Sequence, residues 1–164
     1  MQFLFYLVTL IVGLFLEVVF TRYFSMFGVA PNLLLIFVVA LGFMLGPVTG
    51  ETMGFVWGLM ADSLGVNLFG LHSLVLTLAG YLAGKLRRRV DAERPAPQIV
   101  IACMATLFSA LLASLAYSLT EESEGRIGIL SLVLQMVLNG LVASACFWIM
   151  NRWILLWRIE QEHL

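Results

Sequence analysis

Few side chains in this sequence could do chemistry, and most of them lie near the ends of apolar runs. Glu17 and Asp62 are carboxylates within such runs, and His72 begins another run shortly after Asp62. Together with Arg22 and Asn67 they could line a mouth at one end of the molecule, as a ligand or ion site would require. Alternatively, the two acids pair with Arg22 or extend to a polar surface. We favour this structural role, and we expect Asp62 to pair with Arg22.

Motifs of enzyme active sites are missing from the sequence. It contains no Gly-x-Ser-x-Gly elbow, no His-Glu-x-x-His pair and no Walker loop. His72 directly precedes Ser73, and adjacent residues of a helix point to different sides, so these two do not pair. Cys103 and Cys146 lie in different apolar runs without metal-ligand spacing. We therefore expect a protein that is not an enzyme and that holds no metal or cofactor.

The composition is that of a membrane protein. Of the 164 residues, 62% are hydrophobic and only 12% are charged, and the mean hydropathy is +1.01. A soluble domain carries about 25% charged residues, so this chain has too few charges to cover a globule in water. The net charge of −1 argues against a nucleic-acid partner.

The apolar runs predict an all-α bundle of six transmembrane helices. A helix of about 20 apolar residues crosses the hydrocarbon core. None of the connections is long enough to form a second core, which predicts one domain over residues 1–164. The predicted spans are about 3–20, 31–46, 50–64, 68–86, 99–118 and 128–150.

Glycine recurs at every fourth position across the second and third runs. A single helix over residues 31–64 would place Pro47 and Glu51 near the middle of the bilayer, which is unfavourable for both. We therefore predict a hairpin that turns at residues 46–50, with Thr49 as the candidate N-cap of the second arm. Glycine lets helix backbones approach closely in lipid. The glycines of this pattern are Gly42, Gly46, Gly50, Gly54 and Gly58.

Further small or polar residues recur at helical spacing in the later runs, and we interpret them as packing ridges. Gly80 and Gly84 continue such a ridge, which makes them candidates for helix packing or a partner interface, as are the hairpin glycines. The ridges are Ser73, Thr77, Gly80 and Gly84 in the fourth run, Ala105, Ser109, Ala113 and Ala116 in the fifth, and Ser131, Gln135 and Asn139 in the sixth.

The basic residues predict the orientation of the bundle. Five of the nine Lys and Arg residues lie at the end of the fourth run or between it and the fifth, and Arg152 and Arg158 follow the core of the sixth. The positive-inside rule places these segments in the cytoplasm. With six spans, both termini and the turn at 46–50 then face the cytoplasm as well. The opposite ends of the helices, which carry Glu17, Arg22, Asp62 and His72, then face outward.

Residues 31–88 resemble the MreD family of small bacterial inner-membrane proteins of the rod-shape system. The resemblance is carried by Pro31-Asn-Leu-Leu-Leu, by the Gly-rich turn, by Gly54-Phe-Val-Trp-Gly-Leu-Met-Ala-Asp62, by Gly70-Leu, and by Gly80-Tyr-Leu-Ala-Gly84-Lys-Leu. The family-motif positions are Pro31, Asn32, Asp62 and Gly70. Asn32 stands where the family usually has Asp, so this position lacks the family's charge.

The resemblance implies a non-catalytic scaffold in the multi-pass bacterial inner membrane that binds MreC, a protein with one span and a periplasmic coiled coil. It also implies that the protein acts together with RodA, with the transpeptidase partner of RodA and with MreB to control peptidoglycan synthesis and cell shape. In fold, the family resembles the substrate-binding subunits of energy-coupling-factor transporters. The alternative is therefore a small-molecule-binding transporter subunit with a pocket near Glu17, Asp62 and His72.

Overall fold

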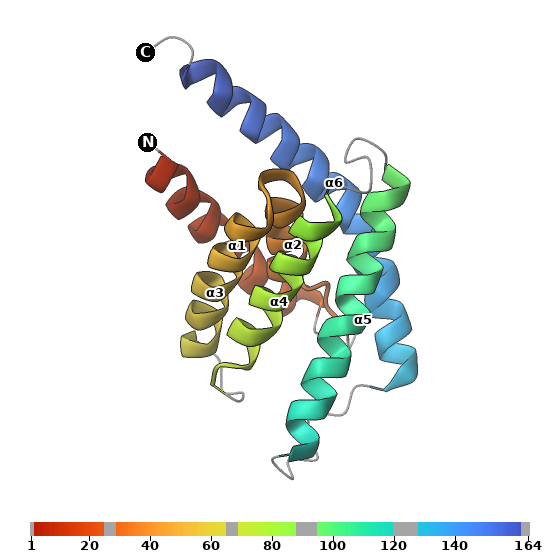
Figure 1. The fold of residues 1–164 in the computed structure, drawn as a ribbon. Helices are drawn as coiled ribbons and strands as arrows, with labels where there is room; N and C mark the ends of the chain where they lie inside the picture. The colour runs from red at the N-terminus through yellow and green to blue at the C-terminus, as the bar shows by residue number, and fades with distance from the viewer. Residues whose placement is uncertain (1, 25–28, 65–68, 88–94, 120–127, 162–164) are drawn as a thin grey trace.

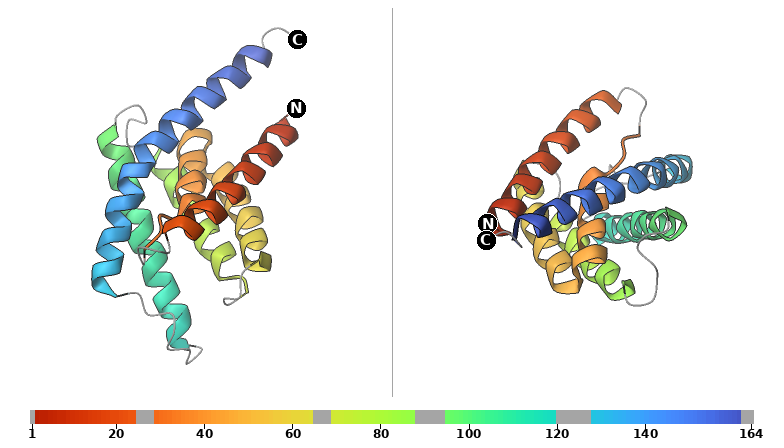
Figure 2. Two further views of the ribbon diagram at one scale, coloured as in Figure 1. Left: turned by 180° about the vertical axis from the view of Figure 1, so that it is seen from behind. Right: turned by 90° about the horizontal axis from the view of Figure 1, so that it is seen from above.

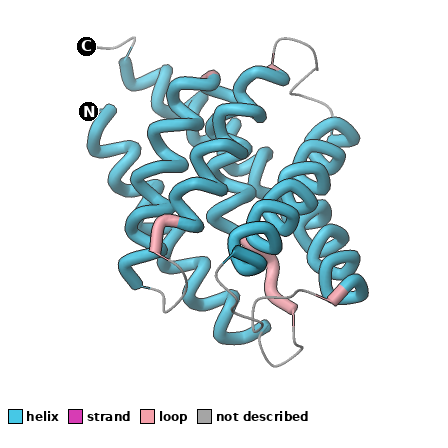
Figure 3. The backbone as a smooth tube through the Cα atoms, turned by 60° about the horizontal axis from the view of Figure 1, so that its bottom comes forward, coloured by secondary structure: helices cyan, strands magenta, loops and turns pink. Residues whose placement is uncertain are grey.

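The computed structural model describes residues 2–24, 29–64, 69–87, 95–119 and 128–161. Asn67 lies outside these ranges, as do three of the basic residues between the fourth and fifth runs, Arg88, Arg89 and Arg94. The described residues form helices and contain no strand, as Figure 3 shows. The prediction of an all-helical protein is thus confirmed for this part of the chain.

The described residues form six helices, which alternate in direction along the chain (Figure 1). Figure 1 and the left view of Figure 2 place four features toward one end of the bundle: the beginning of α1, the α2–α3 turn, the end of α4 and the end of α6. Toward the other end of the bundle lie the ends of α1 and α3 and the beginnings of α4 and α6. The helices are α1 (Gln2–Phe24), α2 (Leu33–Leu45), α3 (Pro47–Leu64), α4 (Leu71–Leu86), α5 (Pro95–Leu119) and α6 (Ile129–Gln161).

Length and composition qualify three of these helices to cross a membrane. They are α1 over Tyr6–Tyr23, α5 over Pro95–Leu119 and α6 over Ile129–Leu155, whereas α2 and α4 are shorter apolar helices. The helices also differ from the predicted spans at some ends. Helix α5 begins four residues earlier, because Pro95 and Pro97 fit in the first turn, where the missing N–H groups cost nothing. Helix α6 continues past residue 150 to Gln161.

Helix α2 is the centre of the fold. All residues from Leu33 to Phe43 are buried, on every side of the helix, and α2 contacts each of the other five helices. The sequence allows this because the segment is apolar all round, the pattern of a helix that is enclosed by protein. Phe43 packs edge to face on Phe147 of α6, with ring centroids 6.0 Å apart, and Phe37 packs in the same way on Trp57 of α3, at 6.4 Å.

Helices α3 and α4 pack with their backbones in direct contact. A Cβ atom placed on Gly54 would collide with the carbonyl group of Leu76, and one on Gly58 would collide with the backbone of Ser73. From the other side, a Cβ on Gly80 would meet the carbonyl of Gly50, and one on Gly84 would meet the backbone of Pro47. The glycines of α3 therefore lie mainly against the backbone of α4, the following helix.

Gly42 and Gly46 differ in role, although the sequence pattern groups them together. A Cβ on Gly42 would strike the carbonyl of Gly80, whereas the nearest atom to a Cβ on Gly46 is a guanidinium nitrogen of Arg87 at 3.9 Å. Gly46 is needed for its positive φ of 112°, which ends α2. Helix α3 then begins at Pro47, so the predicted N-cap at Thr49 is wrong: proline is suited to the first helical position, and Thr49 lies inside the helix.

We expect glycine-to-alanine substitutions to separate close-packing glycines from tolerant ones. Gly54→Ala should lower the free energy of unfolding by about 1–3 kcal/mol, because the backbone atoms that the new methyl group meets cannot rotate away. Gly13→Ala is the matched control, since its Cβ would lie 3.5 Å from the ring of Trp57, an ordinary contact. Unfolding of the purified proteins in mixed detergent micelles, followed by circular dichroism, measures both. Equal stability of the two variants would contradict the packing assignment.

Candidate functional site

Asp62, in the last turn of α3, caps the N-terminus of α4. Its side chain is fully buried. Oδ2 accepts hydrogen bonds from the backbone N–H groups of Gly70 and Ser73, both at 3.0 Å, and Oδ1 accepts one from the N–H of His72 at 3.1 Å. These are donors that the first turn of a helix leaves without internal partners, and a negative charge is favoured there by the helix dipole. Asp62 therefore anchors the beginning of α4 to the end of α3.

The His72 ring completes this cap. Its Nδ1 lies 2.9 Å from Oδ1 of Asp62, and because a carboxylate only accepts, Nδ1 carries the proton in this contact. The ring is partly exposed, at 38% of its side-chain surface. These partners differ from the Arg22 guanidinium that we expected for Asp62; Arg22 lies at an exposed position in the last turn of α1. Gly70 precedes α4 with a φ of 93°, which explains the need for glycine at this position.

Glu17 plays the corresponding part for α2. From the middle of α1, its Oε2 accepts hydrogen bonds from the N–H groups of Leu33, at 2.7 Å, and Leu34, at 3.1 Å. Asn32 supplies the local cap, because its Oδ1 accepts from the N–H of Leu35 at 2.9 Å. The first turn of α2 is thus satisfied by one side chain from a different helix and one from its own N-cap.

A buried polar chain joins this helix start to α5 and α6. The N–H of Asn32 donates to Oδ1 of Asn139 at 2.9 Å, and Nδ2 of Asn139 donates to the Thr106 hydroxyl at 2.8 Å. That hydroxyl in turn donates to the carbonyl of Ala102 at 2.7 Å. Asn139 and Thr106 are almost completely buried. Each member of the chain finds a partner, so the network fixes how α2, α5 and α6 sit against one another.

The four family-motif positions all gather at these two helix starts. Pro31 is buried just ahead of the N-cap Asn32, and Gly70 just ahead of α4 receives the cap from Asp62. These four positions therefore form the starts of α2 and α4 in this fold.

This arrangement offers little for catalysis. The Ser73 hydroxyl donates to the carbonyl of Phe55 at 3.3 Å, so it is not held as a nucleophile by the His72 ring. Within the described residues, no group of three or more His, Cys, Asp or Glu side chains could hold a metal ion. Cys103 and Cys146 are free thiols. Glu51 is exposed near the beginning of α3, about 16 Å along the helix from Asp62.

Sequence reasoning missed the long-range link between Asn32 and Asn139. The spacing of Ser131, Gln135 and Asn139 marked a polar stripe on α6, but it was interpreted as packing alone. In the structure Asn139 bonds to Asn32, and Nε2 of Gln135 lies 3.5 Å from the carbonyl of Ala30, at the same helix start. The available signal was the amide of Asn139 within an apolar run, since a buried amide needs a hydrogen-bond partner in the protein.

Comparison with known families gives one match. The family model described as rod shape-determining protein MreD matches residues 1–159. Neither the search of curated proteins nor the search of solved structures returned a match.

We expect Asp62→Asn to weaken the bundle. An amide at this position turns a donor toward backbone N–H groups, which leaves at least one buried donor unpaired and removes the charge at the helix start. The expected loss of unfolding free energy is about 1–3 kcal/mol. Glu51→Gln, an exposed acid on the same helix, is the control and should be neutral. Detergent unfolding of both variants measures the difference, and a neutral Asp62→Asn would exclude the capping role.

Proposed function

This chain belongs to the MreD family of rod shape-determining proteins, and we propose that it serves the rod complex as a non-catalytic membrane scaffold that binds MreC. Through MreC it would act with RodA, its transpeptidase partner and MreB to help control peptidoglycan synthesis and cell shape. The observation that carries this proposal is the family match, which extends over nearly the whole chain, residues 1–159. The family match lends no support to the alternative of a small-molecule-binding transporter subunit.

The site geometry supports a scaffold. The Asp62 carboxylate accepts three backbone N–H groups and faces the His72 ring, and Oε2 of Glu17 accepts two more. Polar groups that a ligand site would need are thus engaged in holding helices together. Close backbone contact between α3 and α4 adds to this, because helices without intervening side chains have little freedom to shift. Such a bundle presents a fixed surface to a partner.

We further propose that all six helices cross the inner membrane as one domain, with both termini in the cytoplasm. The alternation of helix ends in Figure 1 supports this, since both chain ends lie toward the same end of the bundle. The exposed Lys85, Arg87 and Arg152 lie at that end of their helices, in agreement with the positive-inside rule. Because α2 and α4 are shorter than the hydrocarbon core, they would begin below the level of the outer headgroups.

Cysteine labelling tests this orientation in whole cells. In a Cys103→Ala, Cys146→Ala background, Glu122→Cys should react with an impermeant maleimide from outside, and Arg94→Cys should react only after lysis. We expect this pattern because the connection that contains Arg94 is rich in basic residues, which the positive-inside rule places in the cytoplasm. The opposite labelling pattern would invert the proposed topology.

Capture of MreC tests the function. The tagged chain, co-expressed with MreC and extracted in mild detergent, should retain MreC through affinity and size-exclusion steps, and it should restore rod shape to cells that lack their own MreD. A six-helix membrane protein of unrelated family, carrying the same tag, is the control for unspecific retention. If the chain remains helical by circular dichroism and neither holds MreC nor restores rod shape, the scaffold proposal is wrong.

A further inference from the structure

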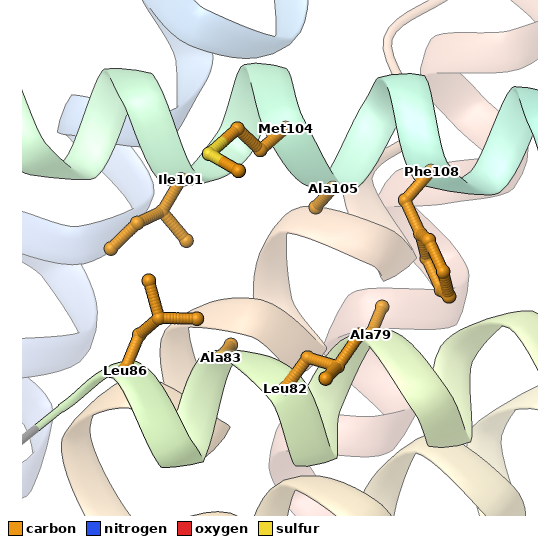
Figure 4. A pocket seen from close by; sticks show the side chains of 8 residues that line it. All are labelled: Ala79, Leu82, Ala83, Leu86, Ile101, Met104, Ala105 and Phe108. Atoms are coloured by element: carbon orange, nitrogen blue, oxygen red, sulfur yellow. The ribbon is translucent and has the colours of Figure 1, made fainter.

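An apolar groove runs along the outside of the bundle between α4 and α5. Its volume is about 260 Å³, and its lining is made only of apolar side chains. Figure 4 shows these side chains facing one another across the gap, with small ones, Ala79, Ala83 and Ala105, where larger residues would close it. Leu82 and Met104 line the groove and are exposed, so the groove opens sideways, toward the surroundings of the bundle.

The dimensions of the groove fit a hydrocarbon chain. Along α4 it extends from Ala79 to Leu86, a rise of about 10 Å. A volume of about 260 Å³ over this length is a narrow channel, whereas an α-helix with its side chains is about 10–12 Å in diameter. An acyl chain can enter such a channel, but a second helix could only lie across its rim.

Two exposed cations, Lys85 and Arg87, lie at the end of α4, next to the groove residue Leu86 in the sequence. The Lys85 ammonium group lies 4.9 Å from the centre of the Tyr81 ring, and the guanidinium group of Arg87 lies beside Gly46. Long side chains of this kind reach several ångströms to meet a charge at a membrane surface. Exposed cations beside a crevice between membrane helices are typical of sites for anionic lipid headgroups.

We propose that the α4–α5 groove binds an anionic phospholipid, with an acyl chain between Ala79 and Leu86 and the phosphate at Lys85 and Arg87. The site combines an apolar channel of the width of one chain with two exposed cations at the end of α4. That polarity orients the lipid, with its headgroup at the end of the bundle where α4 ends and α5 begins. This binding site is separate from the caps at Asp62 and Glu17 and does not depend on the proposed capture of MreC.

Native mass spectrometry of the full-length protein tests the proposal. The protein is released from nanodiscs that contain equal amounts of phosphatidylglycerol and phosphatidylcholine, and the lipids that remain bound are identified. Phosphatidylglycerol should be retained in preference. Lys85→Gln with Arg87→Gln should reduce its retention by about tenfold, since each cation near an anionic headgroup contributes to binding. Arg152→Gln, an exposed cation on α6 toward the same end of the bundle, should leave retention unchanged.

A second pair of variants tests the channel. Ala83→Phe places a ring in the groove and should displace the acyl chain, whereas Leu111→Phe, at a position of α5 that is 62% exposed, should not. The charge variants involve exposed side chains, so they keep the proposal falsifiable if Ala83→Phe does not fold. Equal retention of both lipids, or retention that none of the variants alters, would overturn it. Ala83→Phe that keeps phosphatidylglycerol but loses a bound protein would assign the groove to a partner helix instead.

Discussion

The N–H groups in the first turn of an α-helix have no partner within the helix, and the interior of a bilayer offers no water to replace one. Helices α2 and α4 have only 13 and 16 residues, or about 20 and 24 Å, which is less than the roughly 30 Å of a hydrocarbon core. Their starts are satisfied by acids from the preceding helices, Glu17 on α1 and Asp62 on α3. The start of each short helix is thereby held in position by the helix that precedes it in the sequence.

Close packing follows from the same constraint. The Asp62 carboxylate reaches the first turn of α4 only if α3 and α4 run side by side to their ends, and their glycines allow this along the whole interface. The helix pair in turn covers one side of α2, while α1, α5 and α6 cover the others. Asn139 and Thr106 tie α5 and α6 to the start of α2. Polar contacts therefore set the position of the helices, and glycine and apolar packing fill the space between them.

The sequence predicted residue types better than residue partners. Glycines at a spacing of four indicated close packing because the absence of a Cβ is a local property, but the helix on which Gly54 and Gly58 pack depends on the tertiary fold. The backbone partners of Asp62 could not be predicted, since almost every residue carries a backbone N–H and the sequence does not mark those that a helix start leaves unpaired. Thr49 failed as a cap because Pro47 starts the helix earlier.

The start of α2 also explains why asparagine is suitable at position 32, where the resemblance leads one to expect an acid. Oε2 of Glu17 already accepts the N–H groups of Leu33 and Leu34, and Oδ1 of Asn32 accepts that of Leu35. A carboxylate at position 32 would place a second acid at the same partly buried helix turn, where repulsion between the two charges is screened less than in water. Asparagine keeps the acceptor and removes the second charge. The acidic group of this helix start is supplied from α1 instead, which couples the position of α1 to α2 in a way that a local aspartate would not.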